Sequence, residues 1–163
     1  MHNYFAMFAA YNRWANERLY ATVAELDPAD FVADRGAFFK SVHGTLNHIL
    51  VADQIWMRRF TGNGPEPHSL DEILHDSFSG LQTARRAEDA RIIGWIASLN
   101  ETTIVRRISY TTMAGEAKQN DLIVLLGHLF NHQTHHRGQV HCLLTGFGKQ
   151  VPPLDLVYYQ REE

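Results

Sequence analysis

The sequence has one cysteine, Cys142, and therefore cannot form a disulfide within a single chain. Cysteine-poor chains are typical of reducing compartments, so we expect a cytoplasmic protein. No apolar run approaches the roughly 20 residues that a membrane-spanning helix needs. The opening residues, MHNYFAMFAAYNRWANERL, also lack the basic start and the cleavage site of a secretory signal peptide. We therefore expect no membrane partner.

The chain also lacks an excess of positive charge. It has 15 Lys and Arg residues against 18 Asp and Glu residues, which gives a net charge of -3. A protein that binds the phosphate backbone needs a basic surface, and the basic pairs here are scattered along the sequence. We therefore expect no nucleic-acid partner.

Several catalytic motifs are missing. The sequence contains no H-E-x-x-H, no G-x-S-x-G and no glycine-rich phosphate loop. A di-iron carboxylate bundle needs Glu-x-x-His twice, and only Glu72-Ile-Leu-His75 has that form. These absences exclude the common metalloprotease, hydrolase and di-iron signatures.

The length and composition are those of an ordinary globular protein. The chain has 163 residues, 45% of them hydrophobic and 20% charged. A domain of this size buries roughly two-thirds of the surface of its unfolded chain, so it needs no disulfide or metal ion to fold. Without internal repeats or linkers, we expect a single domain over residues 1–163.

The apolar residues recur every three or four positions in four long stretches, which is the spacing of amphipathic helices. The predicted helices span residues 4–26, 41–60, about 69–99 and 121–144. Ser69-Leu-Asp-Glu72 has the form of a capping box that opens the third helix, and Asn120 is predicted to cap the fourth. Alternating side chains between residues 102 and 118 predict a short β-hairpin. The fold class is therefore all-α: a four-helix bundle with one long crossover and a hairpin before the last helix.

The last predicted helix is unusually rich in histidine. Residues 131–141, NHQTHHRGQVH, hold four of the ten histidines. At 100° per residue, His128, His132, His135 and His136 lie on one side of the helix. His132 can pair with any of the other three so that two ring nitrogens reach one metal ion. Spacing alone leaves the three pairings open.

A third ligand must come from another element, because two imidazoles leave most of the coordination sphere to water. The second predicted helix offers His43 and His48, which are about 140° apart around the helix, so only one should face the interior. His48 sits between the apolar residues Leu46 and Ile49, and we favour it. The alternative interpretation is that these histidines are hydrogen-bonded core residues that bind no metal.

Three stretches carry a resemblance to a known family. They are YNRWANERL, SVHGTLNHILVADQIW, and LFNHQTHHRGQVHCLLTGFG with the PPLDL that follows it. On these motifs, which are spread over nearly the whole chain, the protein resembles the DinB family of metalloenzymes with a four-helix bundle. The resemblance implies a divalent metal ion held by His48, His132 and His136. We expect the metal ion to be zinc or nickel in preference to iron or manganese.

The resemblance also implies an activity. Family members with this fold are described as thiol-dependent transferases and isomerases that use a low-molecular-weight thiol. We therefore expect a metal-dependent S-transferase or isomerase acting on a small-molecule substrate, and a homodimer. Two alternatives stay open: a metal-dependent hydrolase of a small amide or ester, and a non-catalytic helical module that the metal stabilises.

Residues next to the predicted ligands are expected to support the site without binding the metal ion. Gln139 and Asn47 could orient a ligand imidazole through its second nitrogen. Arg137 projects about 140° away from His132, so we expect it to pair with an acidic residue such as Asp53 or Asp155.

Other side chains on the two helices are predicted to stay out of the coordination sphere. Cys142 is expected to pack among apolar neighbours rather than to react. Trp56 could form a pocket wall or part of the core. His128 and His135 are either polar groups on the substrate side or surface residues.

Overall fold

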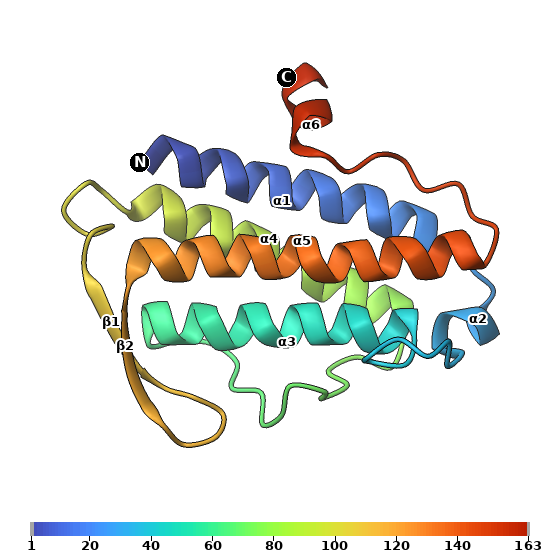
Figure 1. Ribbon diagram of the computed structural model, residues 1–163, viewed down its shortest axis with the longest axis horizontal. Coiled ribbons are helices and arrows are strands. Elements are labelled where there is room, and N and C mark those ends of the chain that lie inside the picture. Colours follow the sequence, from blue (N-terminus) through green and yellow to red (C-terminus); the bar gives the residue numbers. More distant parts are fainter. Residues whose placement is uncertain (1, 163) are drawn as a thin grey trace.

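The computed structural model describes residues 2–162, which form four long helices, two short helices and one two-stranded sheet (Figure 1). The elements are α1 (His2–Val23), α2 (Pro28–Val32), α3 (Val42–Thr61), α4 (Phe78–Ser98), β1 (Arg107–Thr111), β2 (Ala117–Asp121), α5 (Leu122–Gly146) and α6 (Leu156–Glu162). Across residues 2–162, no helix is long and apolar enough to cross a membrane. The predicted helical bundle with a hairpin before the last long helix is confirmed.

The four long helices pack in a ring, in which α1 and α3 each contact both α4 and α5. The chain runs in the same direction along α3 and α4, and α3 runs opposite to α5 (Figure 1). Because α3 and α4 are parallel neighbours, the chain must return along the length of α3 before α4 can begin. Residues 62–77 make this return and are the long crossover of the bundle (Figure 1).

The prediction that a helix begins at Ser69 is wrong. Helix α4 begins at Phe78, and the Ser77 side chain caps it by accepting a hydrogen bond from the Gly80 backbone N–H. The Glu72 carboxylate instead accepts a hydrogen bond from the His68 backbone N–H at 2.6 Å, within the crossover. The local pattern suits a helix start, but the parallel arrangement of α3 and α4 requires an extended return segment there.

The other boundaries differ from the predictions by a few residues. Helix α3 begins after Ser41, whose hydroxyl accepts a hydrogen bond from the Gly44 N–H, and ends at Thr61, followed by the C-cap Gly62 with φ 75°. In the hairpin, Asn120 pairs with Ile108 and so belongs to β2, which leaves Asp121 to precede α5. Asn120 is therefore not the cap of α5. The short helices α2 and α6 were not predicted.

The apolar core has two large clusters along the bundle, beside a smaller one of Tyr11, Ala15 and Tyr159. One, nearer the hairpin, includes Phe5, Met57, Ile92 and Leu126, and each of these side chains comes from a different long helix. The other, towards the opposite end, is built in the same way and includes Leu19, Leu46, Leu81 and Val140. The bundle therefore buries apolar surface at both ends without a metal ion.

A buried polar network links the four long helices. The Arg85 guanidinium on α4 lies 2.5 Å from the Asp53 carboxylate on α3 and 3.0 Å from the Asp89 carboxylate. Asp53 also accepts a hydrogen bond from Gln133 on α5, and Asp89 accepts one from Asn16 on α1. All five side chains are at most 2% exposed, so each depends on the others for hydrogen bonds.

Arg137 belongs to this network through neutral partners. Its guanidinium donates hydrogen bonds to the side-chain oxygens of Asn12 and Gln133. The expected ion pair with Asp53 or Asp155 is wrong, because Asp53 is already engaged by Arg85. The buried guanidinium is thus satisfied by amide oxygens from α1 and α5.

Replacing Arg85 by Met should lower the free energy of unfolding by about 3–5 kcal/mol, since the substitution leaves Asp53 and Asp89 buried without their counter-ion. The matched control is Arg86→Met, at the exposed neighbouring position, which should change stability by less than about 0.5 kcal/mol. Urea unfolding followed by circular dichroism measures both variants. Equal stabilities would contradict the importance of the network.

Candidate metal centre

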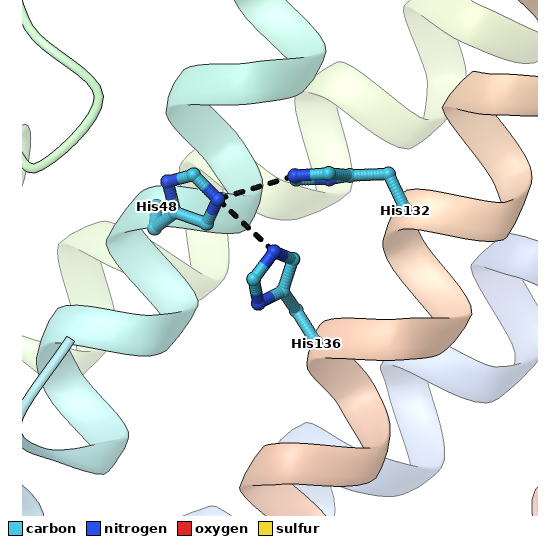
Figure 2. A group of neighbouring side chains, drawn as sticks. All are labelled: His48, His132 and His136. Carbon is cyan, nitrogen blue, oxygen red and sulfur yellow. Dashed lines mark hydrogen bonds between the residues drawn. The ribbon is translucent and has the colours of Figure 1, made fainter. Parts of the chain in front are cut away.

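Three histidines meet where α3 packs against α5. His48 Nε2 lies 3.2 Å from His132 Nε2 and 3.2 Å from His136 Nε2 (Figure 2). One ring nitrogen from each residue lies within 4.8 Å of the others. His132 and His136 are one turn apart on α5, and the antiparallel α3 brings His48 opposite both. The pairing of His132 with His136, one of three that spacing left open, is thus the one that meets His48.

The separation of these nitrogens suits one metal ion. Nitrogen ligands at about 2.0–2.1 Å in tetrahedral geometry lie about 3.3–3.4 Å apart, which is close to the observed 3.2 Å. Among residues 2–162, this is the group of metal-ligating side chains that comes together in this way. Three neutral imidazoles could hold a divalent ion and leave part of its coordination sphere open.

The environment keeps the three imidazoles neutral. Burial lowers the pKa of His48 from 6.5 to about 4 and that of His132 to about 3, and the neighbouring His136 reinforces both shifts. Burial also lowers the pKa of His136. All three rings are therefore unprotonated at neutral pH, and their lone pairs are free to bind a metal ion.

Hydrogen bonds orient two of the rings. His48 Nδ1 lies 2.7 Å from the Leu70 carbonyl oxygen in the crossover, which makes Nδ1 the protonated nitrogen and leaves Nε2 unprotonated. His136 Nδ1 lies 2.7 Å from Gln139 Oε1, which has the same effect. The predicted role of Gln139 agrees with this contact. Asn47, however, has hydrogen bonds to none of the three imidazoles: its side-chain amide binds backbone groups of Leu74 and His75, so the role predicted for it is not supported.

A sequence model of the DinB family matches residues 1–163. The chain belongs to the DinB family. It is 21% identical to the Protein DinB of Bacillus subtilis strain 168 over 162 residues, which cover 91% of this chain and 89% of that protein. A crystal structure of a DinB-like protein from Bacillus cereus ATCC 10987 shares the fold, with a TM-score of 0.66 and 16% identity over 85% of this chain and 89% of that one.

One neighbour of the centre in this DinB-family protein was not predicted. The Phe39 ring stacks on the His48 ring with 3.7 Å between centroids and 16° between planes, and its edge approaches His136 at 5.7 Å. Phe39 lies between α2 and α3, where no helical periodicity could mark it. Its place two residues before the Ser41 cap was the one local signal. Phe39 shields one side of the centre from water.

The remaining histidines lie outside the cluster. His128 packs between Trp56 and His132, with ring centroids 5.1 and 5.7 Å away. His135 is exposed and contacts Gln139. His43 hydrogen-bonds to a carbonyl oxygen of the crossover, as expected for a residue outside the coordination sphere.

Two expectations for other side chains have different outcomes. Trp56 is partly buried and packs against the apolar cluster near the hairpin, in agreement with the core interpretation. The prediction that Cys142 is packed among apolar side chains is wrong, because Cys142 is exposed.

Metal affinity should depend on the three clustered histidines and not on their neighbours. Titration of the metal-free protein with Zn²⁺ in a calorimeter should show one ion per chain. His132→Ala should weaken binding by more than the roughly 10- to 100-fold that the loss of an outer-shell contact costs. The matched control is His141→Ala, also on α5, which should bind as the unaltered protein does. Strong binding by His132→Ala would exclude this centre.

The pH dependence of stability should reveal the lowered pKa values. The unfolded chain takes up protons on His48 and His132 near pH 6.5, whereas the folded chain does so only near pH 4 and pH 3. Acid therefore favours the unfolded state, and the free energy of unfolding of the metal-free protein should fall as the pH drops from about 6.5 towards 4.

The control for this pH effect is the double variant His48→Gln/His132→Gln, which should lose less stability over the same range. Burial raises the pKa of Asp53, which acts in the opposite direction but equally in both proteins. The difference between them in urea unfolding at pH 8 and pH 4.5 isolates the two imidazoles. Identical pH profiles would contradict the shifts.

Proposed function

We propose that this protein is a metal-dependent transferase that joins a low-molecular-weight thiol to an electrophilic small molecule. The observation that supports the proposal is the convergence of the three imidazoles: His48 Nε2 lies 3.2 Å from the Nε2 atoms of both His132 and His136. The ligands would be those three nitrogens, with zinc or nickel favoured over iron or manganese. A bound divalent ion lowers the pKa of a thiol, so that the thiolate is present at neutral pH.

The residues of the chain prepare the centre in three ways. The Leu70 carbonyl and the Gln139 amide orient the rings of His48 and His136, so that Nε2 of each ring points inward. Burial leaves those two side chains only 4% and 8% exposed, which keeps the rings neutral and limits access of water. Phe39 covers the side formed by His48 and His136.

The accessible side of the centre lies along α5 towards the hairpin. His136, His132 and His128 lie at intervals of one helical turn on α5. Their solvent exposure increases from the buried His136 through the half-buried His132 to the exposed His128. A substrate would therefore approach over His132 and His128 rather than past Phe39. Three protein ligands and one open side are the arrangement of a catalytic rather than a purely structural site.

The decisive test is thiol-dependent turnover. With reduced glutathione and an activated aryl halide as probes, the sulfur–carbon bond would form, the carbon–halogen bond would break, and a proton and a halide ion would be released. The zinc- or nickel-loaded protein should exceed the rate of the metal-free blank, and His136→Ala should remove that excess. Release of the aryl product is measured by absorbance.

Cys142→Ser is the matched control for this assay, because it removes the protein's own exposed thiol without touching the centre. It should retain the full thiol-dependent rate. Metal-dependent hydrolysis of simple esters or amides, without any thiol requirement, would replace the transferase proposal by the hydrolase alternative. Tight metal binding without turnover in either assay would favour the non-catalytic module.

A further inference from the structure

One face of α3 connects the histidine centre to the hairpin end of the bundle. Ile55 and Arg59 follow His48 by seven and eleven residues, which places each of them within about 20° of His48 around the helix. The crossover, residues 62–77, lies along α3 (Figure 1). It contacts His48 through the Leu70 carbonyl.

A cavity of about 600 Å³ lies at the far end of this face. Its walls include Ile55 and Arg59 of α3, His68 of the crossover and Tyr110 of β1. His68 is two residues before Leu70, so the wall of the cavity and the support of His48 belong to one short segment. The volume is in the range of pockets that bind small molecules.

Arg59 is a half-buried cation in this wall. Its guanidinium lies 4.6 Å from the Trp56 ring centroid and 4.9 Å from that of Tyr110, and it donates a hydrogen bond to the Thr111 carbonyl oxygen. Within residues 2–162 no carboxylate forms a salt bridge with it, whereas the adjacent Arg58 pairs with Glu66 at 2.6 Å. Burial lowers the pKa of Arg59, which reflects the cost of a charge without a counter-ion.

A row of side chains joins Arg59 to the histidine centre. His132 neighbours His128 at 5.7 Å, His128 neighbours Trp56 at 5.1 Å, and the Arg59 guanidinium lies over the Trp56 ring. This row follows the accessible side of the centre. A molecule lying along it would meet the metal ligands at one end and an unpaired guanidinium at the other.

We propose that Arg59 binds a carboxylate at the far end of the molecule whose reacting end lies at His48, His132 and His136. The proposal rests on the proposed function, because it names the class of substrate that the centre would accept. An Arg–carboxylate pair supplies the missing counter-ion and two directed hydrogen bonds. The carboxylate can belong to the thiol or to its acceptor, and the two sources are separable by experiment.

Anchoring the hairpin does not account for Arg59 by itself. Arg106 also ties the hairpin to α3, through a hydrogen bond from its guanidinium to the Phe60 carbonyl oxygen at 3.2 Å. The register of the hairpin consists of residue pairs between β1 and β2 and includes no residue of α3. Removing the Arg59 charge should therefore leave the hairpin folded.

The geometry also sets the length of the molecule. Eleven residues of helix separate His48 from Arg59, about 16 Å along the axis. The Arg59 guanidinium lies over the ring of Trp56, which is about one turn nearer to the centre. A span of about 10–15 Å between sulfur and carboxylate follows. At about 1.2 Å per bond, an extended chain with roughly 8 to 12 bonds between the sulfur and the carboxylate carbon covers this span.

The test is a series of linear ω-mercaptoalkanoic acids of about three to eleven carbons, each compared with the mercaptoalcohol of equal length. Calorimetry with the zinc-loaded protein should show that the acid binds about 10- to 100-fold more tightly than the alcohol at the matching length, and less so at shorter lengths. Arg59→Gln should abolish this preference. Arg107→Gln, which removes a charge from an exposed position of the same hairpin, should keep it.

Two further arms separate the possible failures. Alkanoic acids without sulfur, and the metal-free protein, report Arg59 binding alone. If the preference for acids depends on Arg59 but needs neither zinc nor sulfur, it supports the carboxylate site. In that case the carboxylate belongs to the acceptor molecule, and the result counts against a metal-bound thiol. Equal binding of acids and alcohols to the unaltered protein, or an acid preference that survives Arg59→Gln in a protein with an unchanged circular dichroism spectrum, overturns the proposal.

Discussion

The buried ion pair of Arg85 with Asp53 is the interaction on which the arrangement of the bundle depends. Asp53 is the point where α3, α4 and α5 meet, because it binds Arg85 and also accepts a hydrogen bond from Gln133. Gln133 directly follows His132 in the sequence. A slip of α5 by one turn, about 5.4 Å, would leave Asp53 and Gln133 unpaired in the interior and would move the histidine pair away from His48. The network therefore selects the register that assembles the centre.

A second constraint comes from the direction of α3 and α4. Because the two helices run parallel, residues 62–77 must cross the length of the bundle, and they do so along the face of α3 that carries His48. The Asn47 side chain fastens this crossover by accepting hydrogen bonds from the Leu74 and His75 N–H groups. The parallel packing of α3 and α4 thus places the crossover where it supplies the Leu70 carbonyl that orients His48. The same segment supplies a wall of the cavity near Arg59.

The two sides of the histidine centre differ, and this difference affects the direction from which a ligand can approach. Phe39 and Gln139 enclose the side of His136 with an aromatic ring and an amide. The side of His132 opens instead towards His128 and Trp56. Neutral imidazoles, a covered side and an open side favour the binding of a ligand from one direction.

The sequence by itself determined the helical fold, the hairpin and the residues that form the centre. Periodicity revealed α1, α3 and α5, because an amphipathic helix repeats its pattern locally, and the spacing of His132 and His136 is likewise a local property. The choice among the three histidine pairings came from the family resemblance and not from the spacing.

Only the tertiary structure decided what depends on contacts between distant segments. Four findings belong to this group. They are the extended chain at Ser69 where a helix was predicted, the role of Asn47 as an anchor of the crossover, the stacking of Phe39 on His48, and the amide partners of Arg137. Each follows from the parallel packing of α3 with α4 and from the register that the buried charges impose. Local sequence patterns carry no record of helix direction or register, because those are set by which side chains are satisfied across the core.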